Sequence, residues 1–356
     1  MPTLELALEV TPRARLDVID VRARAAEIHG EALAEFARCM YVSRHTTAGY
    51  LPQSLAARLT TRAGTVAPYL ELVQTVFPEG AGYLHDQLEL RHELAPEQRA
   101  VEPTNADSHL AFMGGGLHAC VSYDARRPGP VYFVDLDGTY AGSPRRRVTT
   151  LVGYDREEEV ARTTIQVPVS AHPIDAVNLK DLRVGLYDQI RELIATHGVT
   201  KGRLRLGLGS GEQAASLTVN EYETLLMQHD LAEVLRNPMR FAAEKARHAW
   251  NDPRAVPAKA LGYAQYDMVR AFNRLLDALG LKESRIERLL ARTLEVPASR
   301  FLRMRRSVDL LVSDTDRPGQ GHGAIVEGTY QAPILVQWRP APEGVRQIDV
   351  ALTRFL

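Results

Sequence analysis

The sequence has few cysteines, no long apolar run and almost no net charge. Its two cysteines, Cys39 and Cys120, exclude a disulfide framework and cannot alone form a zinc knuckle, so they indicate a reducing compartment. No apolar run approaches the roughly 18 residues of a membrane span, and residues 1–20 are too acidic and too polar for a signal peptide. Lys and Arg number 43 against 44 Asp and Glu, which gives no support to nucleic-acid binding. We expect a cytoplasmic protein that binds neither nucleic acid nor membrane, with length for two domains.

A worn internal repeat is present in the 356 residues. The motif Gly-Thr-Tyr occurs at residues 138–140 and again at 328–330, and each copy precedes two β-rich segments joined by a polar loop, DREEE or RPAPEG. This pattern predicts a hairpin in each half. Serine and methionine recur upstream at matching distances: Ser108, Met113, Ser299 and Met304. We therefore predict two copies of one domain, residues 1–172 and residues 173–356.

Each predicted half also has a helix that ends in His-Gly, at residues 29–30 and 197–198. A cation in the last turn opposes the helix dipole and glycine tolerates a left-handed cap, so both histidines are interpreted as caps. The second helix has an apolar stripe: Leu182, Leu186, Ile190, Leu193 and Ile194. Residues 240–296 carry further helical periodicity, which predicts a helical hairpin inserted in the second half.

Three histidines stand at predicted strand or loop ends: His45, His85 and His109. Neutral imidazoles far apart in sequence are what a zinc site assembled by folding needs, and three protein ligands leave one position open for water or substrate. Asp86 or Asp107 is placed to orient a ligand imidazole. Packing or capping is the ordinary role of such histidines, and that alternative stays open on the spacing alone.

Four motifs in this order resemble the YjbQ family: HTTAG at 45–49, YLHD at 83–86, NADSH at 105–109 and GTY at 138–140. The resemblance covers roughly residues 15–170. It implies a small α+β domain, often described as a secondary thiamine-phosphate synthase, whose three histidines line a pocket for a metal or for an anion such as phosphate. By position the ligands are His45, His85 and His109. Neighbouring positions implied for substrate, anion or support are Thr46, Thr47, Asp86, Asn105, Asp107 and Ser108.

The chain departs from the family pattern in two complementary ways. After HTTAG the family has Asn-Glu, whereas this chain has Gln53 and Ser54. The second half keeps Asn220-Glu221 but has Glu212 at the histidine position and Arg300 opposite His109. The second copy is therefore expected to have lost its own catalysis. Alternatively, Asn220 and Glu221 complete the first copy's pocket across the two halves, although local helix capping is the ordinary role of such residues.

Two further motifs have weaker functional interpretations. LRLGLGSGE at 204–212 resembles a dinucleotide or S-adenosylmethionine loop, but its third glycine falls one position early and no βαβ alternation follows. The run Arg145-Arg146-Arg147 is suited to a phosphate, although solvent-facing charges at a strand start are the favoured interpretation.

The sequence thus predicts an α+β fold of two tandem YjbQ-like domains, with largely antiparallel or mixed sheets packed against helices. The implied enzyme joins a pyrimidine diphosphate to a thiazole phosphate with loss of pyrophosphate, helped by a divalent cation (zinc, or magnesium for a diphosphate substrate) or by proton donation from His45 or His109. Metal-dependent phosphoester hydrolysis and a non-catalytic binding or scaffold role with a relic site are the alternatives. The resemblance also implies a homo-oligomer, such as a trimer of tandem chains.

Overall fold

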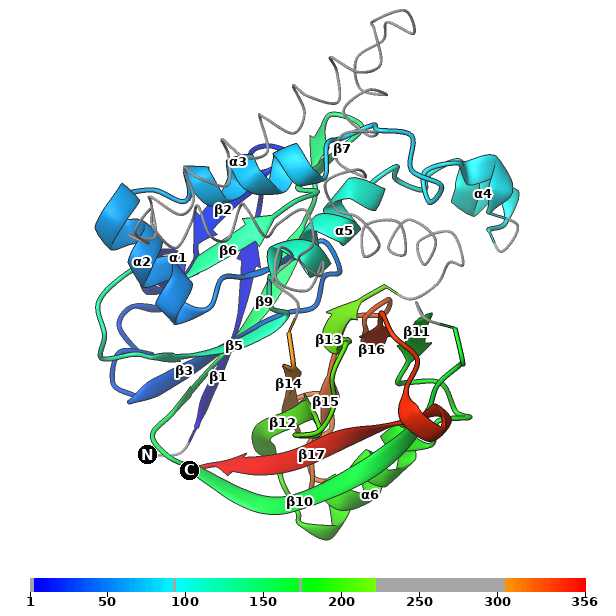
Figure 1. The fold of residues 1–356 in the computed structure, drawn as a ribbon. Helices are drawn as coiled ribbons and strands as arrows, with labels where there is room; N and C mark the ends of the chain where they lie inside the picture. Colours follow the sequence, from blue (N-terminus) through cyan, green and yellow to red (C-terminus); the bar gives the residue numbers. More distant parts are fainter. Residues whose placement is uncertain (1–2, 92–93, 173–174, 222–304) are drawn as a thin grey trace, which may run out of the picture. The chain divides into compact units, whose positions relative to one another are not determined.

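The structure is a computed structural model that describes residues 3–91, 94–172, 175–221 and 305–356 (Figure 1). The chain forms two compact units that interleave in sequence. The first, called the β unit, contains Met1–Gln53, Leu117–Tyr222 and Met304–Leu356; the second, called the helical unit, contains Ser54–Gly116 and Glu223–Arg303. These units cut across the predicted halves 1–172 and 173–356, which stay a prediction. The predicted insert at 240–296 lies outside the described residues, as do Ser299, Arg300 and Met304.

The described part of the helical unit consists of short helices. They are α2 (Gln53–Ala63), α3 (Ala67–Val76), the 3-10 turn η1 (Leu88–Leu90), α4 (Pro96–Arg99) and α5 (Ala106–Gly115). Tyr69 of α3 donates a hydrogen bond to the carbonyl of Gly115 at 3.0 Å, and a Cβ at Gly115 would stand 2.8 Å from the Tyr69 hydroxyl. Glycine at this position therefore lets α3 approach the end of α5. Among the described residues, no helix is both long and apolar enough to cross a membrane.

The β unit begins with one large sheet and one smaller companion sheet. The large sheet has the order β1-β9-β3-β5 and the companion sheet has the order β2-β6-β4. Their bounds are β1 (Leu4–Val10), β2 (Asp17–Asp20), β3 (Arg38–Ser43), β4 (Ala48–Tyr50), β5 (Cys120–Asp124), β6 (Tyr132–Asp135) and β9 (Arg147–Tyr154). The short strands β7 (Thr139–Tyr140) and β8 (Ser143–Pro144) pair with each other between β6 and β9.

A second pair of sheets follows in the same unit, with the orders β10-β17-β12-β14-β15 and β11-β16-β13. Their bounds are β10 (Glu157–Pro168), β11 (Asp175–Asn178), β12 (Lys201–Leu208), β13 (Ala215–Asn220), β14 (Ser307–Ser313), β15 (Ala324–Val326), β16 (Ala332–Gln337) and β17 (Val345–Phe355). The 3-10 turn η2 (Pro342–Gly344) leads into β17. Every strand pair in the described part of the chain is antiparallel. The predicted α+β class with largely antiparallel sheets is therefore confirmed.

The two pairs of sheets repeat one strand order. In each large sheet, the strand that comes first in the chain pairs with the strand that comes last: β1 with β9, and β10 with β17. The next two strands along each sheet also correspond, β3 to β12 and β5 to β14. The companion sheets β2-β6-β4 and β11-β16-β13 correspond in the same way. An isolated bridge outside the strands also recurs, joining Tyr50 to His118 and Leu217 to Arg305. Chain order and sheet order therefore agree across fourteen strands.

Local sequence patterns account for the helices and strands of the β unit. α1 (Val21–His29) begins where Asp20 accepts hydrogen bonds from the amides of residues 22 and 23, and it ends at Gly30 with φ of 64°. α6 (Leu186–Thr196) ends at His197, followed by Gly198 with φ of 56°. Both predicted His-Gly helix ends are therefore confirmed.

The apolar stripe predicted for the second helix is confirmed in part. Leu186, Ile190 and Ile194 are buried along α6. Leu182 is 80% exposed and precedes the helix, which begins only at Leu186. The apolar periodicity therefore identified the buried face but placed the start of the helix one turn too early.

The predicted hairpins are wrong. β9 pairs with β1 and β3, whereas β10, which follows it directly, pairs with β17 in the other large sheet. β16 and β17 likewise lie in different sheets. The two Gly-Thr-Tyr motifs are not equivalent in strand order, because residues 138–140 follow β6 whereas residues 328–330 precede β16. The dinucleotide interpretation of 204–212 is also not supported, because both described neighbours of β12, β14 and β17, are antiparallel to it.

The two large sheets share a hydrophobic core. Tyr154 at the end of β9 stacks on Phe355 at the end of β17, with ring centroids 3.9 Å apart and planes 5° from parallel. The other members of this buried cluster are Met40, Val42, Cys120, Val152, Leu311 and Val326. They come from strands of both large sheets, so the two sets of strands stabilise each other through this core.

A buried arginine stands at or near the start of the last strand of each group. Arg147 donates Nε to Oδ2 and Nη2 to Oδ1 of Asp135 at the end of β6, at 2.7 and 2.9 Å, and Nη2 also donates to the Asp137 carbonyl. Arg346 donates Nε to the Gln337 side chain at the end of β16 and Nη2 to the Arg339 carbonyl. In each group of strands, an arginine at or near the start of the last strand therefore hydrogen-bonds the end of a companion-sheet strand, β6 or β16.

Replacing Arg147 with methionine tests how much this corner depends on the ion pair. The change leaves Asp135, which is fully buried, without its cationic partner, and we expect the free energy of unfolding to fall by about 3–5 kcal/mol. Urea unfolding at pH 7 measures this. Arg146→Met is the matched control, because that side chain is 75% exposed and pairs with Glu9, so it should change stability by about 0.5 kcal/mol or less. Equal losses in the two variants would contradict the assignment.

Candidate functional site

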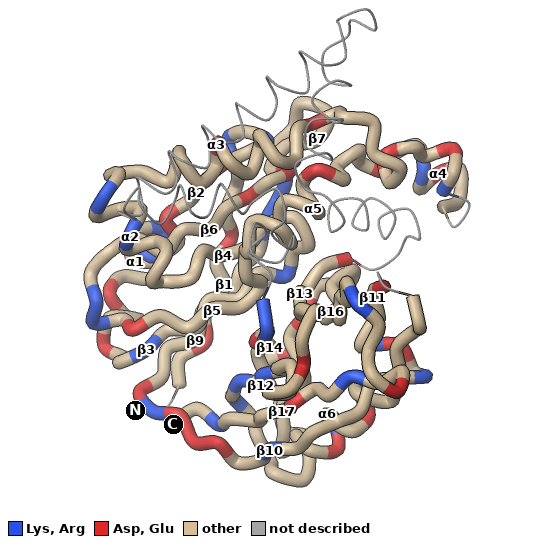
Figure 2. The backbone as a smooth tube through the Cα atoms, in the orientation of Figure 1, with Lys and Arg blue, Asp and Glu red and all other residues tan. Residues whose placement is uncertain are grey.

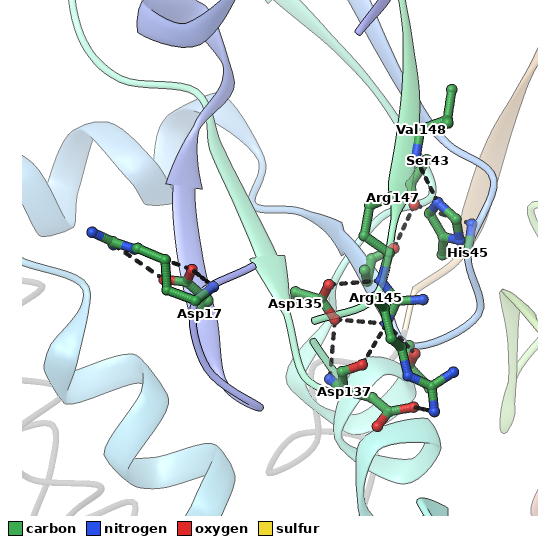
Figure 3. Close-up of polar contacts among 11 residues, drawn as sticks. Asp17, Ser43, His45, Asp135, Asp137, Arg145, Arg147 and Val148 are labelled. Atoms are coloured by element: carbon green, nitrogen blue, oxygen red, sulfur yellow. Dashed lines mark hydrogen bonds and ion pairs between the residues drawn. The ribbon is translucent and has the colours of Figure 1, made fainter. Parts of the chain in front are cut away.

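The loop that carries His45 joins β3 to β4 (Figure 3). The Ser43 hydroxyl closes the loop, because its oxygen accepts the His45 amide at 3.2 Å and its hydrogen is donated to the Ala48 carbonyl at 2.6 Å. The Thr47 carbonyl accepts the amide of Leu136. The loop conformation is therefore held from within and by the strand beside it.

The imidazole of His45 is held by a backbone hydrogen bond. Its Nε2 accepts the amide of Val148 at 3.0 Å, so the proton of the neutral ring lies on Nδ1. Burial lowers the pKa of His45 to about 4, and the neighbouring charges of Arg147, Arg145 and Arg44 contribute in the same direction. His45 is therefore neutral at physiological pH and has a single N–H donor.

Three arginines surround this neutral ring, and they are not equivalent. Arg147 is buried, and its guanidinium donates hydrogen bonds to the Asp135 carboxylate, to the Asp137 carbonyl and, at 3.4 Å, to the Thr47 hydroxyl. Arg145 lies 2.9 Å from Asp137 through Nη2, but its Nε has no acceptor in the described part of the chain.

Arg44 is likewise only partly engaged. It reaches Thr150 at 3.4 Å and lies 3.9 Å from Asp316. Its Nε also has no acceptor among the residues that the structure describes. Two buried guanidinium N–H groups, one on Arg44 and one on Arg145, thus stand near His45 with unused hydrogen-bonding capacity.

Residues from the second set of strands hold the His45 loop. Gln331 donates its side-chain amide to the carbonyls of Ser43 and His45, at 3.0 and 2.9 Å. Asn220, which is fully buried, donates to the Thr46 carbonyl at 3.1 Å. A Cβ at Gly328 would collide with the Arg44 carbonyl, so glycine is required there. We call these three residues, Asn220, Gly328 and Gln331, the loop clamp.

In the His45 loop, backbone carbonyls accept hydrogen bonds, whereas the backbone amides of Thr46 and Thr47 do not donate any among the described residues. The carbonyls of Ser43, His45, Thr46 and Thr47 all accept hydrogen bonds. Among the described residues, no acceptor is found for the amides of Thr46 and Thr47. A loop whose carbonyls are engaged and whose amides are unused favours anions.

The helical unit brings His85 and His109 together. Both side chains are buried, and their ring centroids lie 5.4 Å apart with planes at 53°. The Nδ1 of His85 lies 3.1 Å from Oδ1 of Asp86, which also accepts the Ala106 amide at the start of α5. A carboxylate at this distance from Nδ1 orients the His85 ring.

The remaining predicted residues lie at the start of α5. Asn105 occupies the N-cap position, and its carbonyl accepts the amides of Ser108 and His109 at 3.0 and 3.2 Å. Its side chain makes no capping hydrogen bond. Asp107 and Ser108 are buried, and the Ser108 hydroxyl lies 3.4 Å from the Asp107 carboxylate. Glu221 follows Asn220 in the β unit, and its amide donates to the Asn220 side chain.

The predicted residues thus fall into two groups. His45, Thr46, Thr47, Asn220 and Glu221 belong to the β unit, whereas His85, Asp86, Asn105, Asp107, Ser108 and His109 belong to the helical unit. Each unit is described by itself, so the grouping of all three histidines stays a prediction. Within either unit, no group of three or more His, Cys, Asp or Glu among the described residues is placed to hold a metal ion.

The geometry of His45 does not fit a metal ligand. Its Nε2 lone pair accepts the Val148 amide, and its Nδ1 carries the proton of the neutral ring. Metal binding would require His45 to release Val148. A donor N–H beside arginines suits an anion instead.

Several residues of this site were not predicted from the sequence. The run at 145–147 was interpreted as solvent-facing, and this holds for Arg146 but is wrong for Arg147, which is 6% exposed, and for half-buried Arg145. A signal was present, because three consecutive arginines at a strand start cannot all face solvent when side chains alternate. Gln331 and Gly328 had no local signal, since their role depends on contacts with a loop almost 300 residues earlier.

Comparisons with solved structures find matches among YjbQ-like proteins. A YbjQ-like protein of unknown function from Sulfolobus solfataricus is 15% identical, with a TM-score of 0.29, over 56% of this chain and 99% of its own. An uncharacterised conserved protein of the YjbQ/UPF0047 family from Clostridium acetobutylicum is 10% identical, with a TM-score of 0.26, over 55% and 99%. A conserved hypothetical protein from Thermus thermophilus is 15% identical, with a TM-score of 0.25, over 55% and 99%.

The chain therefore has structural matches to YjbQ/UPF0047 proteins over about 55% of its length. No family model matches the sequence, and no curated protein matches it either. At these identities and TM-scores the matches carry no information about activity or about individual residues.

The pH response of His45 follows from its surroundings. Its folded-state pKa of about 4 lies below the ordinary value of 6.5, so the unfolded chain takes up the proton first as the pH falls. Folding stability should therefore decrease between about pH 6.5 and pH 4 and should not depend on His45 above that range. NMR titration of the His45 ring measures the pKa, with His45→Gln identifying the resonance and removing its share of the pH dependence. A pKa near 6.5 would contradict the burial of the His45 ring beside the three arginines.

The loop clamp can be tested through its glycine. Gly328→Ala places a methyl group against the Arg44 carbonyl, so we expect a loss of about 1–3 kcal/mol in stability and a changed chemical shift for His45. Urea unfolding and NMR measure the two effects. Gly211→Ala is the matched control, because no atom lies within 4 Å of a Cβ there. An unchanged His45 resonance in Gly328→Ala would argue against the loop clamp.

Proposed function

We propose that the chain is a diverged tandem duplication of a YjbQ-like domain. The repeated strand order of the large and companion sheets supports this proposal, and so do the paired arginines at positions 147 and 346. β9 ends at Tyr154 and β10 begins at Glu157, so we place the junction at residues 155–156, earlier than the 172–173 boundary suggested by sequence motifs.

We propose further that the protein is an enzyme acting on a small phosphorylated substrate whose phosphoryl group binds at the His45 loop. The observation that carries this proposal is the set of unused donors there: the Nε groups of Arg44 and Arg145 and the amides of Thr46 and Thr47. Phosphoryl oxygens accept several hydrogen bonds and favour arginine. The Nδ1–H of neutral His45 adds one more donor.

In the helical unit, His85 and His109 are the proposed acid–base groups. A carboxylate beside Nδ1 of His85 orients the ring for proton transfer. Transfer with loss of pyrophosphate, as the resemblance implies, needs stabilisation of charge on the leaving group. Arg44 and Arg145 supply positive charge without a metal, so no step is assigned to zinc or magnesium. Hydrolysis of a phosphoester uses the same groups and is the alternative reaction.

The second half is proposed to support the site without a reaction of its own. At the position of His45 it has Glu212, whose two oxygens accept hydrogen bonds from Arg346 at 2.7 Å and from the Gln347 amide at 2.7 Å. A carboxylate in this place repels a phosphate. This observation also favours the second candidate function, a non-catalytic binding protein, if both halves have lost catalysis. Assembly as a homo-oligomer, such as a trimer of tandem chains, remains part of the proposal.

Titration calorimetry with phosphate and pyrophosphate tests the anion site. We expect Arg145→Gln and Arg44→Gln each to weaken binding by about tenfold or more, because each removes a charge-assisted hydrogen bond. Arg146→Gln is the matched control, since this neighbouring arginine is 75% exposed and pairs with Glu9, and it should bind normally. Equal affinity in all three variants, or no binding by the unaltered protein, would overturn the proposal.

Activity distinguishes the enzyme from the binding protein. Release of pyrophosphate or phosphate from phosphorylated pyrimidine and thiazole compounds should be lost in His85→Asn, and reduced in Asp86→Asn, while anion binding persists. Anion binding without turnover of any such substrate would favour the non-catalytic candidate. Elemental analysis of the purified protein adds an independent check, because stoichiometric zinc that is lost in His45→Gln would contradict the hydrogen bond assigned to Nε2.

A further inference from the structure

A cavity lies in the β unit, and no residue of the His45 loop lines it. Its volume is about 180 Å³, and it is enclosed by α1, the segment after α1 and β3. Most of its wall is apolar, formed by alanines and by Leu33. An engineered apolar cavity of about 150 Å³ accommodates benzene, so this one has room for a compact molecule with a few carbon atoms.

Arg22 of α1 lines this cavity and has unused hydrogen-bonding capacity. Its Nη1 donates to the Arg127 carbonyl at 2.8 Å. Its Nη2 is buried and has no acceptor in the part of the chain that the structure describes. A buried guanidinium nitrogen without an acceptor is costly unless a partner is supplied.

The other polar groups at the cavity are neutral donors. Cys39 and Tyr41 of β3 line it, and the Tyr41 hydroxyl lies within hydrogen-bonding reach of Arg22, from which its oxygen accepts, and of Cys39. Burial raises the pKa of Cys39 to about 12 and raises that of Tyr41 well above its ordinary value, so both stay protonated. Glu31 is the one carboxylate in the described lining, and it is exposed at the segment after α1.

We propose that this cavity is a binding site for a small organic monocarboxylate. The carboxylate accepts hydrogen bonds from Arg22 Nη2, after a small rotation of the guanidinium toward the cavity, and from the Tyr41 hydroxyl. The apolar body of the ligand lies against Leu33 and Ala26. The site selects a single negative charge, because one guanidinium supplies the positive charge and Glu31 repels a second negative group. This proposal does not depend on the phosphate site.

The probes are butyrate and benzoate, with phosphate and succinate as dianionic comparisons. Binding is measured by ligand-observed NMR and by the shift in melting temperature. We expect butyrate and benzoate to bind the unaltered protein in the millimolar range or tighter. Arg22→Met should weaken binding by about tenfold or more, while phosphate binding at the His45 loop is unchanged.

Two further variants keep the test decisive. Arg24→Met is the matched control, because Arg24 lies on the same helix and is half exposed with Glu27 as its partner, and it should bind carboxylates normally. Ala26→Leu fills the cavity without altering Arg22 and should also abolish binding. Circular dichroism verifies that each variant is folded, and Arg22→Gln, which also removes the charge and should weaken binding equally, replaces Arg22→Met if that variant does not fold.

Each outcome supports or overturns the proposal. Loss of butyrate binding in both Arg22→Met and Ala26→Leu, with Arg24→Met unaffected, supports it. No carboxylate binding by the unaltered protein, or equal binding by Arg22→Met, overturns it and leaves Arg22 as a structural link to residue 127. Tighter binding of phosphate or succinate than of butyrate at this cavity would overturn the proposed selection of a single charge.

Discussion

A single buried guanidinium organises the corner of the β unit where the candidate site lies. Arg147 joins the start of β9 to the end of β6 through Asp135, and to the His45 loop through Thr47. The next residue in the chain, Val148, donates its backbone amide to the imidazole of His45. The position and the charge state of the imidazole therefore both depend on where the ion pair of Arg147 and Asp135 places the first residues of β9 (Figure 3).

The loops after β3 and β12 differ in charge. Figure 2 shows acidic and basic residues interspersed along the described chain, without one sign dominating. The difference is local: the loop after β3 carries a neutral histidine among arginines, whereas the loop after β12 carries Glu212 paired with a buried arginine. One loop keeps unused donors and the other has its charge neutralised internally. Asn220 and Gln331, which lie outside the Glu212 loop, hold the carbonyls of the His45 loop in place.

Sequence patterns identified what depends on neighbours along the chain. The His-Gly helix ends and the buried face of α6 were both predictable, because they follow from helix periodicity and capping. The HTTAG loop was also singled out correctly as a strand end. Pairing of strands was not predictable in this way. β9 and β10 are consecutive and separated by a short polar turn, which favours a hairpin locally, yet each has its partners in a different sheet. The burial of Arg147 was missed for the same reason, since Asp135 stabilises it from another strand.

The pairing of β10 with β17 joins residues 157–168 to residues 345–355, and this separation has a consequence for the order of folding. Contacts between distant segments form slowly, because a long loop must close before they stabilise the chain. During synthesis the His45 loop emerges long before Gln331, so it exists for most of that time without the side chain that fixes its carbonyls. The contacts that hold the carbonyls of the His45 loop therefore belong to the late, long-range steps of folding, because they join residues almost 290 positions apart.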